Sequence, residues 1–240
     1  MKKILIVDNT FDPPHGCPEI RAHLEENAKE FGSIEVASAR APESQLPADL
    51  TGIDGVVISG SRTRILENAP WIEKEMAMIR ELYAKKIPTF GICYGEQLIA
   101  KTLAGEQYVA VAKQSEHGFV EMQMSPEAAK SPLFSGLKEK FYTYEWHSDE
   151  VLPLPKGFRT LAQSTDCAVQ AFEVEGAPMW GVQFHPERGL EGGKQSLDRK
   201  IARNENQKIF NREIADKVFD PSVAKSMFTN FLKQVWKIKS

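Results

Sequence analysis

The sequence has no long hydrophobic run and almost no net charge, and both shortages exclude classes of protein. No apolar stretch reaches the roughly 18 residues that a membrane-spanning helix needs. The formal net charge of -3 gives no overall field that would favour nucleic acid or an anionic membrane as a partner. The hydrophobic content of 42% is that of an ordinary globular protein with a buried core.

Cysteine is also scarce: Cys17, Cys93 and Cys167 are few, odd in number and far apart. This pattern does not indicate a disulfide framework. The opening "MKKILIVDNT" has two lysines, but its apolar part ends before Asp8 and is too short for a secretory signal. We therefore expect a cytoplasmic protein with reduced thiols, and a first buried strand in place of a signal.

Two further absences concern cofactors. The chain has no Gly-Lys-Ser/Thr phosphate loop, so no nucleotide is implied. None of His15, His23 and His117 lies at ligand spacing from another histidine or a cysteine. We accordingly expect no metal and no cofactor, and we expect Cys17 and Cys167 to be inert thiols.

The first half of the chain alternates strand-like and helix-like segments. Short apolar runs typical of buried parallel strands are followed by longer runs of helical composition. This alternation predicts a parallel sheet covered by helices. The expected strands are 3–8, 34–39, 55–60 and 87–93, and the expected helices are 19–31, 69–86 and 95–105.

After residue 106 the pattern changes to six short strand-like runs separated by turn residues. They predict antiparallel strands, added to the same sheet or forming a layer beside it. Residues 188–220 are polar with mixed charge and predict a helical insertion, and 221–239 predict an amphipathic closing helix. Because no low-complexity linker divides the chain, we expect one domain over 1–240. The six runs are 107–112, 118–124, 140–146, 158–164, 167–174 and 178–184.

The stretch "TFGICYGEQLIA", residues 89–100, places Cys93 between Gly91 and Gly95, where a strand meets a helix. Such a junction has the form of a nucleophile elbow, in which a tight turn lifts the middle side chain above the sheet. The helix N-terminus would then stabilise a thiolate. The alternative is a structural cysteine in the core. The flanking glycines favour the nucleophile.

A thiolate nucleophile needs a base, and the base needs a group that orients it. The stretch "WGVQFHPE" supplies both, because His185 and Glu187 are two residues apart at a strand end and leave the same face. Glu187 can hold one ring nitrogen of His185 and turn the other toward Cys93. The alternative is an exposed strand end where the two residues have no joint function.

"GICYGEQ" and "FHPE", about ninety residues apart, resemble the two signature motifs of class I (triad-type) glutamine amidotransferases. The resemblance covers residues 2–187 and the closing helix. It implies an α/β, three-layer sandwich with a central mostly parallel, flavodoxin-like sheet plus a small antiparallel sheet. It also implies that Cys93, His185 and Glu187 form a triad. In such a triad the thiolate attacks the side-chain amide of glutamine, ammonia leaves, and water hydrolyses the γ-glutamyl thioester.

The resemblance further implies an oxyanion hole made by backbone N–H groups. One donor comes from Tyr94, and the other comes from the turn "ISGSR" with Gly60 and Ser61. The family usually shows Ser-Gly-Gly-Pro in this turn, so Ser61 and Arg62 depart from the pattern and put the shape of the loop in question. The alternative is an ordinary polar turn.

Substrate-binding residues are implied in two places. Gln97 matches the glutamine of the elbow motif and would contact the substrate. The segment "EWHSDEV" resembles the one that holds the two ends of the substrate, and Asp149 would pair with its ammonium group unless it caps a turn. The candidates in this segment are Trp146, His147, Ser148 and Asp149.

Three functions are compatible with these motifs. The first is a stand-alone glutaminase, similar to the glutaminase domain of GMP synthase, that passes ammonia to a separate synthetase. The second is a γ-glutamyl peptide hydrolase that uses the same triad. The third is a non-catalytic regulatory or interaction module, against which the intact triad argues.

Two expectations concern the surroundings of the triad. Because a carboxylate one turn from a thiolate disfavours ionisation, we expect Glu96 to point away, toward solvent or a partner surface. The insertion 188–220 follows His185 and Glu187 directly, so it would cover the mouth of the site or dock an acceptor enzyme. A solvated insertion without such a role is the alternative.

Overall fold

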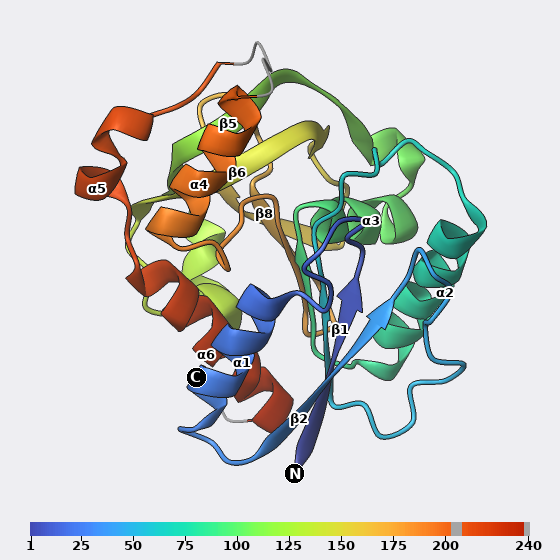
Figure 1. The fold of residues 1–240 in the computed structure, drawn as a ribbon. Helices are drawn as coiled ribbons and strands as arrows, with labels where there is room; N and C mark the ends of the chain where they lie inside the picture. The colour runs from blue at the N-terminus through green and yellow to red at the C-terminus, as the bar shows by residue number, and fades with distance from the viewer. Residues whose placement is uncertain (203–207, 238–240) are drawn as a thin grey trace.

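The computed structural model describes residues 1–202 and 208–237, and its strands form one mixed sheet (Figure 1). The strand order is β2-β1-β3-β4-β9-β8-β7-β5-β6. Neighbouring strands are parallel from β2 to β9 and antiparallel from β9 to β6. The strands are β1 Lys2–Asp8, β2 Ile34–Arg40, β3 Gly55–Ile58, β4 Thr89–Ile92, β5 Val109–Met124, β6 Lys140–Val151, β7 Phe158–Gln163, β8 Ala171–Val174 and β9 Met179–Val182.

Helices cover both faces of the parallel half. In Figure 1, α1 and α6 lie on one side of β1, and α2 and α3 lie on the other. Alternate residues of β1 enter two separate cores: Ile4 and Ile6 pack with α1 and α6, whereas Leu5 and Val7 pack with α2 and α3. The structure therefore confirms the α/β class and the three layers. The helices are α1 Pro18–Ala28, α2 Pro70–Lys85, α3 Tyr94–Leu103, α4 Leu190–Ile201, α5 Ala215–Val218 and α6 Ser222–Trp236.

The antiparallel strands extend the main sheet, which is the first of the two arrangements expected from the sequence. The runs 107–112 and 118–124 belong to a single long strand, β5, whose pairing with β6 shifts register between Val111 and Glu116. Within the described residues, no helix is both long and apolar enough to span a membrane.

The insertion 188–220 packs against the outer face of β5 and β6. Leu197 of α4 and Ala215 of α5 share a small core with Phe119 and Tyr144. The backbone at Phe210 pairs with β5, and a Cβ at Gly118 would come within 2.3 Å of the Phe210 carbonyl oxygen. The part of the insertion at 203–207 lies outside the described residues. Its described part contains α4 and α5 and packs against the sheet.

Candidate active site

The backbone at Cys93 has the geometry of an elbow. β4 ends at Ile92, α3 begins at Tyr94, and Cys93 between them has φ 53° and ψ −106°. A positive φ is costly for a residue with a Cβ, so such strain persists only where the surrounding structure enforces it. The Cys93 N–H donates to the Val182 carbonyl at 2.7 Å and fastens the turn to the end of β9.

Two glycines allow α3 to begin directly on the sheet. A Cβ at Gly95 would lie 2.4 Å from the carbonyl oxygen of Ile58, in β3. A Cβ at Gly91 would lie 2.7 Å from the Gly95 carbonyl carbon. Because real Cβ atoms do not approach backbone atoms so closely, no other residue fits at either position without displacing the elbow.

We expect Gly95→Ala to lower the free energy of unfolding by about 3 kcal/mol, because the new methyl group overlaps the backbone of β3. Urea denaturation measures this difference. Gly189→Ala is the matched control, since a Cβ there meets nothing within 4 Å. Equal stability of the two variants would show that α3 is free to shift away from the sheet.

The pairing of β4 with β9 explains how two motifs far apart in sequence meet. Gly91 pairs with Gly181 and Ile92 pairs with Val182 in parallel register. The elbow and the His-Pro-Glu turn therefore both leave the carboxyl edge of the sheet, from adjacent strands. This edge is where open α/β sheets bind their ligands.

His185 is held between the Glu187 carboxylate and the Cys93 thiol. Its Nδ1 donates to Glu187 Oε1 at 2.7 Å, and its backbone N–H donates to the Tyr144 carbonyl at 2.9 Å. Burial opposes the charged imidazole, but Glu187 and Cys93 outweigh it and raise the pKa of His185 to about 10. Burial likewise opposes the charge on Glu187, yet the charge of His185 lowers the pKa of that carboxyl.

The helix α1 supports the His-Pro-Glu turn, which the sequence did not indicate. His23 Nε2 donates to the Glu187 carbonyl at 3.3 Å, and its ring stacks on Phe228 at 4.8 Å. Arg188 pairs with Glu19 at 2.9 Å. A lone histidine on a helix gives no signal for such a contact, because its partner is distant in sequence.

The turn after β3 lies against the thiol and the imidazole. A Cβ at Gly60 would be 3.1 Å from His185 Cε1 and 3.5 Å from Cys93 Cβ. Ser61 Oγ donates to the Asn9 carbonyl at 2.8 Å, and the Asn9 N–H donates to Ser59 Oγ at 2.9 Å. These bonds hold the turn at Cys93 despite its departure from the usual Ser-Gly-Gly-Pro. The oxyanion-hole roles of Gly60, Ser61 and Tyr94 stay predictions.

Trp146 is the member of the 146–149 segment that contacts the nucleophile. The Cys93 thiol donates to its carbonyl oxygen at 3.7 Å, and its ring lies 4.0 Å from that of His117. Ser148, two residues further along β6, is partly exposed. Substrate contact by Trp146 and Ser148 stays a prediction.

Gln97 and Asp149 have partners inside the protein. The Gln97 amide donates to the Asp149 carbonyl and to Gln183 Oε1, both at 2.8 Å. The Asp149 carboxylate accepts from Arg64 Nε at 2.8 Å and from the Ile65 N–H at 3.0 Å. These bonds tie β6 to α3 and to the loop after β3. Substrate contact by Gln97 and Asp149 stays a prediction that these bonds do not support.

His147 belongs to a buried polar group with Glu116 and Cys167, whose side-chain donor atoms lie within 4.8 Å of one another. Glu116 accepts from Ser164 at 2.7 Å and from Gln170 at 2.6 Å, and it pairs with His147 at 3.0 Å. The Cys167 thiol donates to a backbone carbonyl, and burial raises its pKa. Since Glu116 bonds His147 and the Cys167 thiol bonds the Val169 carbonyl, the group already has hydrogen-bond partners within the protein. Substrate contact by His147 stays a prediction.

The expectation for Glu96 was wrong, because its side chain is fully buried. The first turn of α3 rests on the sheet, so the residue three positions after Cys93 faces inward. Gly181 of β9 makes room for it: a Cβ there would lie 2.5 Å from Glu96 Cγ.

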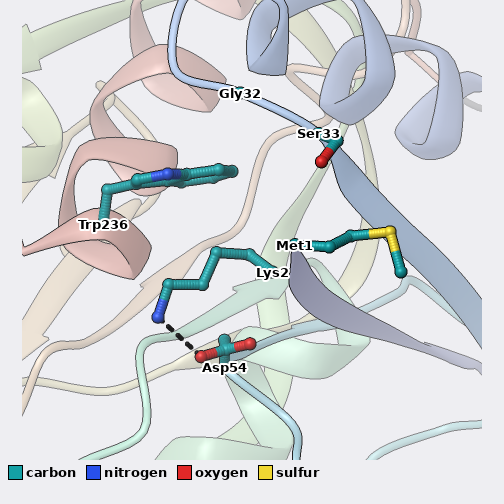
Figure 2. Close-up of a pocket in the computed structure, with 6 residues that line it drawn as sticks. All are labelled: Met1, Lys2, Gly32, Ser33, Asp54 and Trp236. Atoms are coloured by element: carbon teal, nitrogen blue, oxygen red, sulfur yellow. Dashed lines mark hydrogen bonds and ion pairs between the residues drawn. The ribbon is translucent and has the colours of Figure 1, made fainter.

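A surface hollow of about 510 Å³ lies beside Met1 and Gly32 (Figure 2). It is lined at the amino end of β1 by Lys2, whose ammonium group bonds Asp54 at 2.7 Å, and by Trp236 of α6. Its position at the amino ends of the strands separates it from the triad.

Comparison with known proteins agrees with this geometry. The family model described as glutamine amidotransferase class-I matches residues 19–203. The chain belongs to the class-I glutamine amidotransferase family. It is therefore an enzyme of the glutamine amidotransferase type.

Two curated relatives are A subunits of glutamine-hydrolysing GMP synthases. The one from Pyrococcus furiosus is 40% identical over 133 residues. The match covers 55% of this chain and 65% of that protein, which is just under two thirds of its length. The one from Thermococcus kodakarensis is 36% identical over 148 residues, 60% of this chain and 76% of that protein. A solved glutamine amidotransferase from Methylobacillus flagellatus shares the fold, with a TM-score of 0.76 at 23% identity over 97% of this chain and 94% of that one.

Proposed function

We propose that this amidotransferase hydrolyses the side-chain amide of glutamine through a thioester on Cys93 and passes the ammonia to a separate synthetase. The observation that supports this proposal most is the geometry of the turn between β4 and α3. Cys93 stands at a strained turn, bonded at its N–H to the strand that leads into His185, and His185 is bonded to Glu187. Nucleophile, base and orienting carboxylate are thus assembled from adjacent strands.

The proposed reaction has two halves. The Cys93 sulfur bonds to the amide carbon, and N–H groups of Tyr94 and the 60–61 turn receive the charge on the oxygen. The C–N bond breaks as the His185 imidazolium gives its proton to the leaving nitrogen, and ammonia departs. Water, deprotonated by His185, then attacks the thioester and releases glutamate. Glu187 keeps the imidazole oriented in both halves.

The partner is proposed from the relatives. The Pyrococcus and Thermococcus proteins are named as A subunits, which implies a further subunit in their enzymes. We infer that this chain likewise supplies ammonia to a separate ATP-dependent synthetase. The described insertion, which packs over β5 and β6 beside His185, is the proposed cover or docking element.

A substrate screen tests the proposal. Purified protein is incubated with glutamine and with γ-glutamyl dipeptides, and released ammonia or amine is measured together with glutamate. Faster ammonia release from glutamine supports the glutaminase. Amine release from dipeptides without glutamine hydrolysis would establish the γ-glutamyl peptide hydrolase instead, and neither release would reject both.

The contact of α4 with β6 predicts that the insertion affects catalysis. A Cβ at Gly193 would lie 2.9 Å from the rings of Phe119 and Tyr144, and the Tyr144 carbonyl holds the backbone of His185. We expect Gly193→Val to reduce kcat about tenfold to a hundredfold, by shifting β6 and with it the base.

Steady-state hydrolysis of glutamine measures this effect. Gly192→Val is the matched control, because a Cβ at this neighbouring helix position meets only a Glu19 oxygen at 3.8 Å. Equal rates for the two variants would show that the packing of α4 has no influence on the active site and would reject a covering role.

A further inference from the structure

Two glutamates that the proposed mechanism does not use lie behind Cys93. Glu96 is in the first turn of α3, and Glu145 directly precedes Trp146, whose carbonyl accepts from the thiol at 3.7 Å. Both side chains are 0% exposed. None of their four carboxyl oxygens has a hydrogen-bond partner among the described residues. Two acids thus approach one thiol from two different elements.

The position of Glu96 is enforced by its surroundings. A Cβ at Gly181 would lie 2.5 Å from Glu96 Cγ and 2.8 Å from the Phe172 ring, so β9 has a glycine where this side chain rests. The side chain is confined between helix and sheet and has no route to solvent in this packing. A charged carboxylate held there without donors would be strongly unfavourable.

The positive charges near the thiol are already paired with other carboxylates. His185 bonds Glu187 at 2.7 Å and His147 bonds Glu116 at 3.0 Å. Arg64 and Arg188 are likewise paired, with Asp149 and Glu19. None of these four side chains, among the described residues, is therefore free to neutralise a negative charge on Glu96 or Glu145.

The ionisable groups that act on the two acids all oppose a further negative charge. Burial raises the pKa of Glu96 well above its usual value, and Cys93 adds to the effect. Burial also raises the pKa of Glu145, followed by the charges of Glu116, Cys93, Glu96 and Glu187. The acidic groups around the pair are Cys93, Glu116, Cys167 and Glu187, and the two histidines nearby, His147 and His185, already bond the carboxylates of Glu116 and Glu187.

We propose that Glu96 and Glu145 are neutral carboxylic acids at working pH and act as positioning residues that surround the thiol without competing with it for negative charge. The inference rests on the proposed function, since it takes Cys93 as the nucleophile. Two neighbouring acids in a buried site do not both ionise readily. With both glutamates protonated, Cys93 is left to form the ion pair with His185.

The pH dependence of stability tests the protonation. A carboxyl that keeps its proton only when folded makes the protein less stable as pH rises from about 4.3, the unfolded value, to the native pKa. Each such group raises the unfolding equilibrium constant about tenfold per pH unit. Glu96→Gln keeps the shape of the side chain and removes the titrating proton. Its unfolding constant should therefore rise less steeply than the wild type's between about pH 6 and about pH 8, by up to about tenfold per pH unit.

Urea denaturation at the two pH values provides this comparison. Glu127→Gln, at a partly exposed surface position where the carboxylate pairs with Lys130, is the control that should match the wild type. The same pH dependence in Glu96→Gln as in the wild type would overturn the proposal. If Glu96→Gln does not fold, Glu145→Gln is subject to the same test. A specific gain of wild-type stability with potassium over tetramethylammonium would also overturn it, because it would indicate anions that hold a cation.

Alkylation of Cys93 by iodoacetamide at neutral pH tests the effect on the thiol. Cys17 and Cys167 are buried with raised pKa values, and peptide mass spectrometry identifies the labelled site. Since one neutral group replaces another, the Glu96→Gln rate should stay within about twofold of the wild type. A rate about tenfold higher would mean that Glu96 is an anion in the wild type and would overturn the proposal.

Neither measurement requires turnover. Absence of glutamine hydrolysis would therefore count against the proposed function alone, and the pH slope and the alkylation rate decide the state of the two acids separately.

Discussion

Replacement of Cys93 by alanine is expected to lower the kcat for glutamine hydrolysis by about 10⁴-fold or more, while the protein stays folded. The thiol forms the only covalent bond between enzyme and substrate in the proposed reaction, so no thioester can form without it. The fold should persist because alanine fills the same backbone position and loses only the contacts of Sγ with the Trp146 carbonyl and with His185.

Ammonia release measures the rate, and urea denaturation checks the fold. Cys167→Ala is the matched control, since that thiol is also buried but donates to the Val169 carbonyl, away from the elbow. Acid quenching of the wild type followed by mass spectrometry should detect a γ-glutamyl adduct on Cys93. Ammonia release by Cys93→Ala at more than about a hundredth of the wild-type rate would contradict covalent catalysis at this residue.

The elbow and the His-Pro-Glu turn could be recognised from the sequence because their signals are local. Two glycines around one cysteine, after an apolar strand, define the elbow, and the structure shows why each glycine is needed: Gly95 has no room for a Cβ against Ile58. The meeting of the two motifs follows from one further fact, the parallel pairing of β4 and β9. No short segment of the sequence predicts that two strands so far apart in the chain pair with each other. The expectation that the two motifs meet therefore came from the family resemblance.

Other features depend on contacts that no local pattern reports. The inward direction of Glu96 follows from the way α3 rests on β9, where Gly181 leaves the space. The expectation that Glu96 points away was based on the unfavourable effect of a carboxylate near a thiolate, and it was wrong because the packing of the helix on the sheet decides the direction of this side chain. The bond from His23 to the Glu187 carbonyl and the pairing of Phe210 with β5 likewise join residues distant in sequence.

Replacement of Glu187 by glutamine is expected to reduce kcat by about 10²- to 10⁴-fold and to change the pH dependence of the reaction. In the wild type, Glu187 and Cys93 outweigh burial and raise the pKa of His185 to about 10, so the imidazolium that protonates the leaving nitrogen persists through neutral pH. A neutral amide in place of Glu187 removes this charge. The pKa of His185 should then fall toward its ordinary value of about 6.5.

The sign of the effect follows from the direction of the shift. A histidine with a raised native pKa contributes stability that is fully present below about pH 6.5 and is lost as pH rises through about 10. In the pH profile of kcat, the alkaline limb of the wild type should therefore lie near pH 10, and the alkaline limb of Glu187→Gln should lie at lower pH. The free energy of unfolding of Glu187→Gln should also depend less on pH than that of the wild type. Glu19→Gln, which loses only the ion pair with Arg188 on the same turn, should keep the wild-type limb. An unchanged limb in Glu187→Gln would show that Glu187 does not hold the proton on His185.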